Sequence, residues 1–480
     1  MSRRGVVALA ALVWMPALAH AQALPPMHVD SLTARPFGTV VLYHTTPTPA
    51  HVVLFVSGDG GWNLGVVNMA RELARMDALV VGIDIRRYLP ALEKEPGGCS
   101  YPAADFEALS QSIQHTLGYA RYVPPMLVGY SSGATLVYTL LAQAPPTTFA
   151  GAISMGFCPM LPLHKPLCRG AGLVSTLVPR RKGVEGGYRF APVTDRALRW
   201  TAFQGEIDQV CSPAVVAGYA DSVDGGTLIR LPHVGHGFGV ERNWLPQFKA
   251  AFAALVAAPP VDRRIVAPAV ADLPLVEVPV RGTPRDTFAI VLSGDGGWAS
   301  LDRQVAETLA DSSIRVVGWN SLQYLWKAKT PDSLASDLAR VMRHFLDTWH
   351  AGAVILAGYS RGADVLPFAA ARLPDDLKAR VALIALISPS THAGFEIHPT
   401  DLVLDTHRAS DRPVIPELRA LDFAPTLCFY GSDETDTACP ALPPGAGRVI
   451  ALAGGHHLGG AYVEIGGDIV RALDARKRGL

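Results

Sequence analysis

Residues 356–363 read Leu-Ala-Gly-Tyr-Ser-Arg-Gly-Ala, and residues 127–134 read Leu-Val-Gly-Tyr-Ser-Ser-Gly-Ala. Both stretches fit the pattern Gly-x-Ser-x-Gly, with Ser360 and Ser131 at its centre. Each follows a short apolar run and precedes a helical pattern, and in that context a tight strand-to-helix turn lifts the serine hydroxyl above a sheet. We therefore expect both serines to be nucleophiles, and Ser360 is the stronger candidate.

The recurrence extends along the chain. Ser-Gly-Asp-Gly-Gly-Trp occurs at residues 57–62 and again at 293–298, and a glycine–histidine pair occurs at 235–236 and again at 455–456. Together with the serine stretches, these matches keep one order and similar spacing, which indicates a duplicated domain and not a solenoid. Two domains also suit 480 residues, because single cores stop growing near about 250–300 residues.

The apolar pattern of the second half alternates between strand and helix. Apolar runs of strand length lie at residues 288–292, 314–318, 353–357, 382–387 and 426–430. Stretches with helical spacing, at 301–309 and 331–349, lie between the first three of these runs. Alternating β and α segments build a parallel sheet covered by helices. The predicted fold class is α/β, with two tandem domains of the α/β-hydrolase type, each a mostly parallel sheet wrapped by helices.

The N-terminus has the pattern of a secretory signal. Arg3 and Arg4 precede an apolar run at residues 6–17 and an Ala-x-Ala cleavage site near residue 21. The run is shorter than the roughly 20 residues that span a bilayer. We expect a signal peptide at 1–23, a first domain at 24–257, a Pro/Ala-rich linker at 258–274 and a second domain at 275–480. The mature protein is then exported, soluble and periplasmic.

Composition narrows the function classes. Hydrophobic residues make up 49% of the chain and charged residues 18%, which is typical of a globular protein. Lys plus Arg and Asp plus Glu both number 42, so no basic surface points to nucleic acid. The sequence implies no organic cofactor, and it leaves the oligomeric state open.

Six cysteines in an exported chain favour disulfides. Cys428 and Cys439 are the only two in the second half and are its natural pair. The other four allow three connectivities, which the sequence leaves open; they are Cys99, Cys158, Cys168 and Cys211. None has the spacing of a zinc site, so we expect no metal.

A serine hydroxyl needs a base, and in this fold the order along the chain is serine, acid, histidine. His456 follows two glycines that let its loop approach the nucleophile, and it aligns with His236 of the first half. We therefore prefer His456 to its neighbour His457. His233 competes with His236 but has no counterpart in the repeat.

The acid is expected in the loop before each histidine, where a carboxylate would orient the imidazole. Asp208 is the candidate in the first half. In the second half the loop after residues 426–430 offers three acids. We prefer Asp433, with Glu434 and Asp436 as alternatives.

An oxyanion hole is expected from the glycine-rich loop after the first strand, because glycines let backbone N–H groups approach a developing negative charge. The N–H of Gly296 or Gly297, with that of Arg361, is predicted to form it. Asp295 lies in the same loop and either stabilises the turn or faces a cationic substrate.

Arg361 and Asp364 flank Ser360, where the first half has Ser132 and Thr135. This is the largest chemical difference between the two predicted sites. The charged pair either recognises a charged or phosphate-bearing substrate or forms a salt bridge at the start of a helix.

Taken together, these motifs resemble the VirJ/AcvB family of bacterial virulence proteins. The resemblance rests on Ser-Gly-Asp-Gly-Gly-Trp, on Gly-Tyr-Ser-Arg-Gly-Ala-Asp and on Gly-Gly-His-His; it covers about residues 285–475 and is looser in the first half. It implies a periplasmic α/β-hydrolase that releases lysine from lysyl-phosphatidylglycerol, with Ser360 as nucleophile and His456 as base.

On this resemblance, the partner is an aminoacylated phospholipid at the membrane surface. Asp295 or Asp364 would then bind the lysyl cation, and Arg361 the lipid phosphate. Two alternatives stay open: a non-catalytic periplasmic accessory protein that binds secretion-system proteins, and a generic carboxylesterase.

Overall fold

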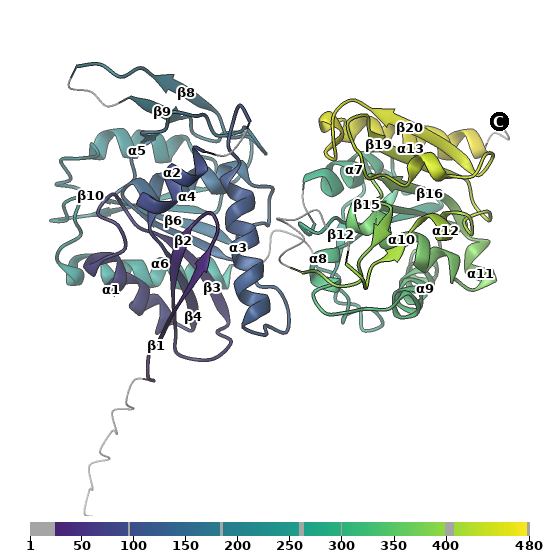
Figure 1. Cartoon of the computed structure of the whole chain (residues 1–480), viewed down its shortest axis with the longest axis horizontal. Coiled ribbons are helices and arrows are strands. Elements are labelled where there is room, and N and C mark those ends of the chain that lie inside the picture. The colour runs from purple at the N-terminus through teal and green to yellow at the C-terminus, as the bar shows by residue number, and fades with distance from the viewer. Residues whose placement is uncertain are drawn as a thin grey trace, which may run out of the picture.

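The computed structural model describes residues 25–94, 97–182, 186–258, 264–298, 300–398 and 408–477. Two α/β units lie side by side (Figure 1), which confirms the predicted tandem fold. The first unit comprises the described residues up to 258, and the second those from 264 onward. The signal peptide predicted at 1–23 lies outside the described residues.

The first unit is built on an eight-stranded sheet of order β1-β2-β4-β3-β5-β6-β10-β11. The β1–β2 hairpin joins β4 antiparallel, and every later neighbour is parallel. Its central strands are buried throughout, as expected where helices cover both faces. The strands are β1 (His28–Ala34), β2 (Gly38–His44), β3 (His51–Val56), β4 (Ala78–Ile83), β5 (Met126–Tyr130), β6 (Gly151–Met155), β10 (Trp200–Gly205) and β11 (Gly226–Leu231).

Helices cover both faces of this sheet. Two of them, α1 (Leu64–Ala74) and α6 (Leu245–Ala257), pack on one face around Phe55 and Phe248. The other face carries four helices, whose apolar side chains join a second core cluster. They are α2 (Ile85–Leu92), α3 (Pro102–Thr116), α4 (Ser132–Gln143) and α5 (Pro213–Ser222).

The second unit repeats this plan with seven strands in the order β12-β14-β13-β15-β16-β19-β20. Only the β12–β14 pair is antiparallel. The order matches that of the first unit without its first strand, so the duplication inferred from sequence is a duplication of topology. The strands are β12 (Leu275–Val278), β13 (Thr287–Leu292), β14 (Arg315–Trp319), β15 (Ala353–Tyr359), β16 (Val381–Ile387), β19 (Thr426–Gly431) and β20 (Gly447–Leu452).

Helix α9 shows why the second unit folds as its sequence predicts. Thr330 and Ser333 form a capping box before an apolar face that is buried on the sheet. On the opposite face lie α7 (Ser300–Asp311) and α13 (Tyr462–Lys477). The helices on the α9 face are α8 (Ser321–Tyr324), α9 (Pro331–Thr348), α10 (Arg361–Ala371), α11 (Asp375–Lys378) and α12 (Ile415–Leu418).

The structure differs from the predicted linker at residues 258–274. Arg264 pairs with Val276, and Val270 and Leu273 are buried in the second core. The apolar side chains in this Pro/Ala-rich stretch find a core to join, so residues 264–274 belong to the second unit. Residues 259–263 of the predicted linker lie outside the described part.

A small antiparallel sheet extends from the first unit between β6 and β10 (Figure 1). It consists of β7 (Met160–Leu161), β8 (Ser175–Val178) and β9 (Gly187–Phe190), and we call the described residues 157–182 and 186–199 the cap. Two disulfides fasten the cap, Cys99–Cys168 to the loop before α3 and Cys158–Cys211 to the loop after β10. Cys428–Cys439 is paired in the second unit, which confirms that prediction.

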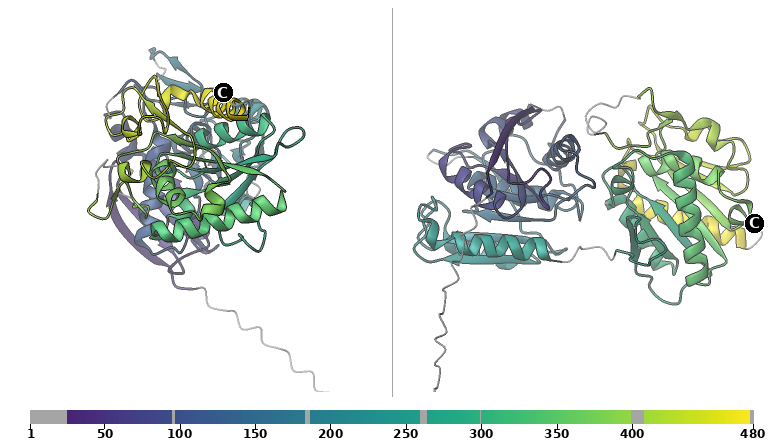
Figure 2. Two further views of the ribbon diagram at one scale, coloured as in Figure 1. Left: turned by 90° about the vertical axis from the view of Figure 1, so that its right-hand side faces the viewer. Right: turned by 90° about the horizontal axis from the view of Figure 1, so that it is seen from below.

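The two units meet through a small set of contacts, and the view from below again shows them as two bodies next to each other (Figure 2). Trp326 donates its indole N–H to Tyr119 O at 2.9 Å and packs its ring on Tyr122. Thr147 Oγ donates to Trp298 O at 3.2 Å. The last contact joins the first unit to the glycine-rich loop of the second.

Two candidate active sites

Ser360 stands at the turn between β15 and α10 with φ 49° and ψ −121°, and Ser131 has nearly the same angles, 56° and −123°. Such a backbone costs about 1–3 kcal/mol, so the surroundings must enforce it. Gly362 allows the close crossing that does so, because a Cβ there would lie 2.4 Å from Leu292 O. Ser360 N–H also donates to Ile387 O of the neighbouring strand at 2.9 Å.

The second unit places serine, histidine and acid in one hydrogen-bonded chain. Ser360 Oγ lies 2.8 Å from His456 Nε2, and His456 Nδ1 lies 2.6 Å from a carboxylate oxygen of Glu434. The acid preferred from sequence, Asp433, is therefore wrong, and the alternative Glu434 holds the position.

The turn after β19 explains the correction. Glu434 N–H donates to Gly431 O, which folds the loop back, and the Glu434 carboxylate then accepts from Gly431 N–H at 2.6 Å and from Ser388 Oγ. Asp433 is exposed and bonds its neighbour Ser432. Asp436, the remaining alternative, accepts from Thr391 N–H.

The first unit forms the same chain with the residues predicted for it. Ser131 Oγ lies 2.9 Å from His236 Nε2, and His236 Nδ1 lies 2.9 Å from Asp208. Asp208 also accepts the N–H groups of Val210 and Cys211. His233, the rival base, is exposed on the surface.

Both acids are held in their charged form. Burial alone would raise the pKa of Glu434, but hydrogen bonds from His456, Gly431 and Ser388 outweigh it and lower the pKa. Burial of Asp208 is likewise outweighed by the N–H groups of the following loop and by His236, so its pKa is lowered. The pKa of His456 is raised: burial opposes its charge, but the bond to Glu434 and nearby carboxylates prevail.

The oxyanion hole differs in detail from the prediction. Gly297 N–H donates to Gly294 O at 3.2 Å and closes a turn, so it does not face a substrate. Asp295 and Gly296 are the central residues of that turn, and the hydrogen bond that closes the turn does not use their N–H groups. Arg361 opens α10, and the helical hydrogen bonds do not use the N–H groups of a helix's first turn. One N–H of the turn, Gly296 included, and that of Arg361 remain the candidate donors.

Asp364 does not face an open site. Asp364 is buried and accepts Ser390 N–H at 2.7 Å, which fixes the loop after β16. Burial raises its pKa to about 7, against the charge of Arg361. The Arg361 guanidinium lies against Gly394, where a Cβ would meet it at 2.6 Å. This pair organises the loops around Ser360.

Asp295 is half-buried, and its charge acts on the histidine of the site, where it helps to raise the pKa of His456. Its charge also acts on Glu107 in α3 of the first unit. Burial, and then Asp295, raise the pKa of Glu107 to about 8, although Gln111 donates to its carboxylate. Sequence reasoning missed Glu107, because nothing in its local pattern shows that α3 packs near the other unit's site.

Two tyrosines were also missed as site residues. Tyr130 donates its hydroxyl to His236 O at 3.0 Å, and Tyr359 donates to His456 O at 3.4 Å. Each ring lies beside the imidazole whose loop it holds. The repeat of Tyr before both serines was a signal that could have identified them.

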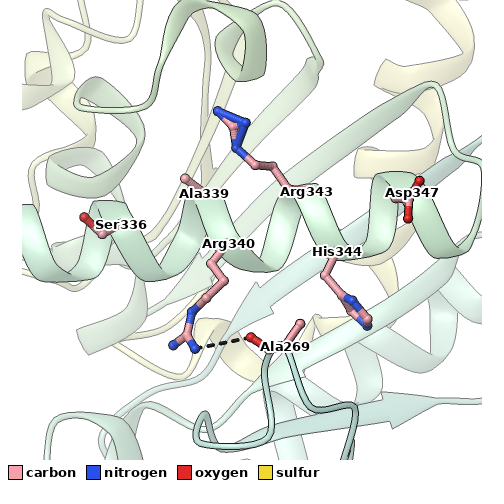
Figure 3. A pocket seen from close by; sticks show the side chains of 7 residues that line it. All are labelled: Ala269, Ser336, Ala339, Arg340, Arg343, His344 and Asp347. Atoms are coloured by element: carbon pink, nitrogen blue, oxygen red, sulfur yellow. Dashed lines mark hydrogen bonds between the residues drawn. The ribbon is translucent and has the colours of Figure 1, made fainter.

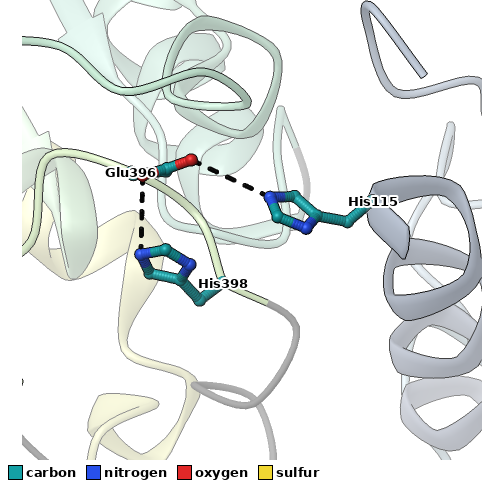
Figure 4. A group of neighbouring side chains, drawn as sticks. All are labelled: His115, Glu396 and His398. Carbon is teal, nitrogen blue, oxygen red and sulfur yellow. Dashed lines mark ion pairs between the residues drawn. The ribbon is translucent and has the colours of Figure 1, made fainter. Parts of the chain in front are cut away.

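Two groups of side chains contain the types of atom that coordinate metal ions. His115, Glu396 and His398 meet between the units, with Glu396 bridging the two imidazoles at 3.8 and 3.6 Å (Figure 4). The His115–Glu396 pair joins the two units, and the Glu396–His398 pair lies within the second unit. Asp208, Cys211 and His236 also cluster, but Cys211 is held in a disulfide and offers no thiolate.

A surface depression of about 690 Å³ lies away from both serines, on α9 (Figure 3). Arg340, Arg343 and His344 line it, and Arg340 is already held by Asp272 and by Ala269 O. It contains no nucleophile–base pair, so the hydrogen-bonded triads, and not this depression, define the candidate sites. Among the described residues, no helix is long and apolar enough to cross a membrane.

Comparison with known proteins gives one family match. Residues 50–155 and 286–477, more than half of the chain, match the family model described as bacterial virulence protein (VirJ). No curated protein matches the chain.

Solved structures to which this chain is similar include Est1E from Butyrivibrio proteoclasticus (13% identity, 42% of this chain and 96% of that one, TM-score 0.32). An α/β serine hydrolase without lid from Xanthomonas campestris is 20% identical over 49% of this chain and 97% of that one, with a TM-score of 0.31. These likenesses say nothing about the substrate.

Proposed function

The chain belongs to the VirJ family of bacterial virulence proteins, and from this premise we propose that its second unit is a periplasmic serine hydrolase that releases lysine from lysyl-phosphatidylglycerol. The observation that carries the proposal is the hydrogen-bonded chain Ser360–His456–Glu434 at 2.8 and 2.6 Å. Its geometry is that of a nucleophile activated by a base that an acid orients.

The chemistry is acyl transfer. His456 takes the proton of Ser360 Oγ as the oxygen attacks the lysyl carbonyl, and the N–H groups at Arg361 and in the glycine-rich turn face the developing oxyanion. His456 then protonates the glycerol oxygen as the ester bond breaks. Water, activated by the same imidazole, hydrolyses the lysyl-serine ester, so that lysine leaves and Ser360 regains its proton.

The dicationic lysine requires negative charge near Ser360. Asp295 lies in the glycine-rich loop, and Glu107 adds a second carboxylate from the first unit. The charge of Asp295 adds to the cost of ionising Glu107, and an ammonium group bound near Asp295 would reduce that cost. Asp295 is thus favoured over Asp364, whose carboxylate is committed to Ser390. A phosphate role for Arg361 has less support, because its guanidinium lies against Gly394.

An exported location fits the disulfides. Three are formed in the described residues, and such bonds persist in oxidising compartments. The VirJ family membership agrees with an exported bacterial protein. The periplasm is then the compartment in which the enzyme meets its lipid.

The test is lysine release from vesicles that contain lysyl-phosphatidylglycerol, with wild type, Ser360→Ala and Ser131→Ala compared. We expect release by wild type and Ser131→Ala and a loss of about 10³-fold or more in Ser360→Ala. Equal activity on a soluble lysine ester and on the vesicles would instead indicate a generic carboxylesterase. No release by folded wild type would leave the accessory-protein alternative, in which secretion-system proteins are the partners.

A further inference from the structure

The first unit has a complete triad of its own, 2.9 Å at each step, on a serine with the same backbone as Ser360. We propose that it is a second, separate hydrolase centre and that it cleaves esters with an uncharged, apolar acyl group. The proposal goes beyond the lipid esterase of the second unit and does not depend on it.

Hydrogen bonds and a disulfide hold the acid of the first unit's triad in place. Asp208 is nearly inaccessible and receives the N–H groups of Val210 and Cys211 and the amide of Gln204 in addition to His236. The disulfide Cys158–Cys211 fastens this acid loop to the base of the cap. A serine that served only to shape the turn would not need a strained backbone, a bonded base and a buried acid together.

The acid loops of the two units differ at two matched positions. Counted from the glycine that ends the strand, Ile207 corresponds to Asp433, and Val210 corresponds to Asp436. Ile207 is 60% exposed and Val210 is 68% exposed, on either side of the triad acid. The second unit has carboxylates at these positions, where Asp433 is exposed and Asp436 accepts from Thr391, whereas the first unit has exposed branched aliphatic side chains.

Further apolar side chains of the first unit are exposed, one of them in the loop that follows His236. Val240, four residues after His236, is 48% exposed. On the cap, Val174 and Leu177 are exposed as well. Burying one such side chain against a substrate contributes about 1.5–3 kcal/mol, so an apolar acyl chain would gain affinity at several of these positions.

The charged residues around the second triad are replaced in the first. Ser132 stands in place of Arg361 and donates its hydroxyl to Asp59, the counterpart of Asp295, at 2.7–2.8 Å. Thr135 stands in place of Asp364 and donates to Cys158 O. The first site therefore has fewer charged side chains beside its serine. The carboxylate of its glycine-rich loop, Asp59, already accepts a hydrogen bond from Ser132.

The reaction is balanced within the unit and water. Ser131 Oγ attacks the acyl carbonyl while its proton passes to His236 Nε2, the ester C–O bond breaks, and His236 returns the proton to the leaving alcohol. Water then loses a proton to His236 and attacks the acyl-serine. The carboxylic acid leaves, and the proton returns to Ser131.

The experiment uses the full mature chain with Ser131→Ala, Ser360→Ala and both together. A fluorophosphonate probe, read by intact mass, is expected to add twice to wild type, once to each single variant and not to the double variant. With p-nitrophenyl butyrate, Ser131→Ala is expected to lose about 10³-fold in kcat/KM, whereas Ser360→Ala keeps most of the activity. Circular dichroism and a thermal unfolding profile that match wild type show that the first unit of Ser131→Ala is folded.

Specificity is tested by Ile207→Asp with Val210→Asp, which installs the acids of the second unit. We expect kcat/KM for the butyrate ester to fall about tenfold or more, with probe labelling of Ser131 retained. Absence of label on Ser131 in wild type, or butyrate hydrolysis that disappears with Ser360→Ala, overturns the second centre. Unchanged butyrate kinetics in the Asp variant overturn the apolar acyl specificity. None of these readouts uses the lysyl lipid.

Discussion

Glu434 and Asp208 occupy the same place in the two units: each stands three residues after the glycine that ends its strand, and each bonds Nδ1 of its histidine, at 2.6 and 2.9 Å. The longer glutamate side chain reaches the imidazole from a loop that carries a different sequence. The duplicated fold has thus kept the position of the acid while its residue type changed.

This equivalence predicts the effect of removing the acid. Glu434→Gln should lower kcat for lysine release by about 10³–10⁴-fold, because an amide no longer holds the tautomer in which His456 Nε2 accepts the serine proton. Asp433→Asn is the matched control and should stay within about twofold, because Asp433 is exposed and outside the chain. Steady-state kinetics on both variants measure this, and the reverse ranking would restore Asp433 as the acid.

The raised pKa of His456 sets the pH dependence of the second site. The imidazole must be neutral to act as a base, so kcat/KM should rise with pH through an apparent pKa above the ordinary 6.5. Removing the carboxylate removes the main cause of the upward shift, so the residual activity of Glu434→Gln should titrate at a lower pH. The profile is measured in a Ser131→Ala background to exclude the first unit. An identical profile in both proteins would contradict the assignment.

Two glycines near Ser360 should respond differently to a methyl group. At Gly362 a Cβ would lie 2.4 Å from Leu292 O, whereas at Gly296 nothing lies within 4 Å. Gly362→Ala should therefore cost about 1–3 kcal/mol or more in the free energy of unfolding, while Gly296→Ala stays within about 0.5 kcal/mol. Denaturant unfolding of both variants provides the comparison. Similar stabilities would mean that the turn at Ser360 is looser than its backbone angles indicate.

The sequence predicts those parts of the two sites that recur in both halves of the chain. Both serines, His236 and His456 were identified because the motif, its strand-to-helix context and the duplication all agree. The acid of the second unit was not, since the direction of a side chain in a loop depends on a turn that no local pattern specifies. Alignment of the loops from Gly205 and Gly431 would have selected Glu434.

Long-range contacts explain the other differences. Glu107 approaches Asp295 only because α3 packs beside the second unit, and neither helix nor loop carries a pattern for that contact. Val270 and Leu273 were assigned to a linker because Pro and Ala surround them, yet their burial depends on a core that forms from distant residues. Local composition predicts where regular structure ends but not which core a segment joins.

Asp295 should determine selectivity for a cationic acyl group. In a Ser131→Ala background, Asp295→Asn is expected to raise KM for the lysyl ester about tenfold and to leave hydrolysis of an uncharged ester at Ser360 nearly unchanged, because only the ammonium group loses a partner. Asp59→Asn, at the matching position of the first unit, should leave the lysyl ester unaffected. Unchanged selectivity in Asp295→Asn would falsify the cation-binding role.

The Cys428–Cys439 disulfide should matter for both stability and catalysis in the second unit. It closes a short loop, at a sequence separation of 11, that contains Glu434, and both cysteines are fully buried. Replacing both by serine should remove about 3 kcal/mol by loop-closure entropy and leave the acid less firmly placed. We therefore expect a lower kcat with KM nearly constant, together with a lower midpoint of unfolding.

The control is Cys99→Ser with Cys168→Ser, which affects only the cap of the first unit. Its kinetics at Ser360 should match those of wild type. If kcat at Ser360 is the same in both double variants, the disulfide serves stability alone and the turn at Gly431 is sufficient to place Glu434.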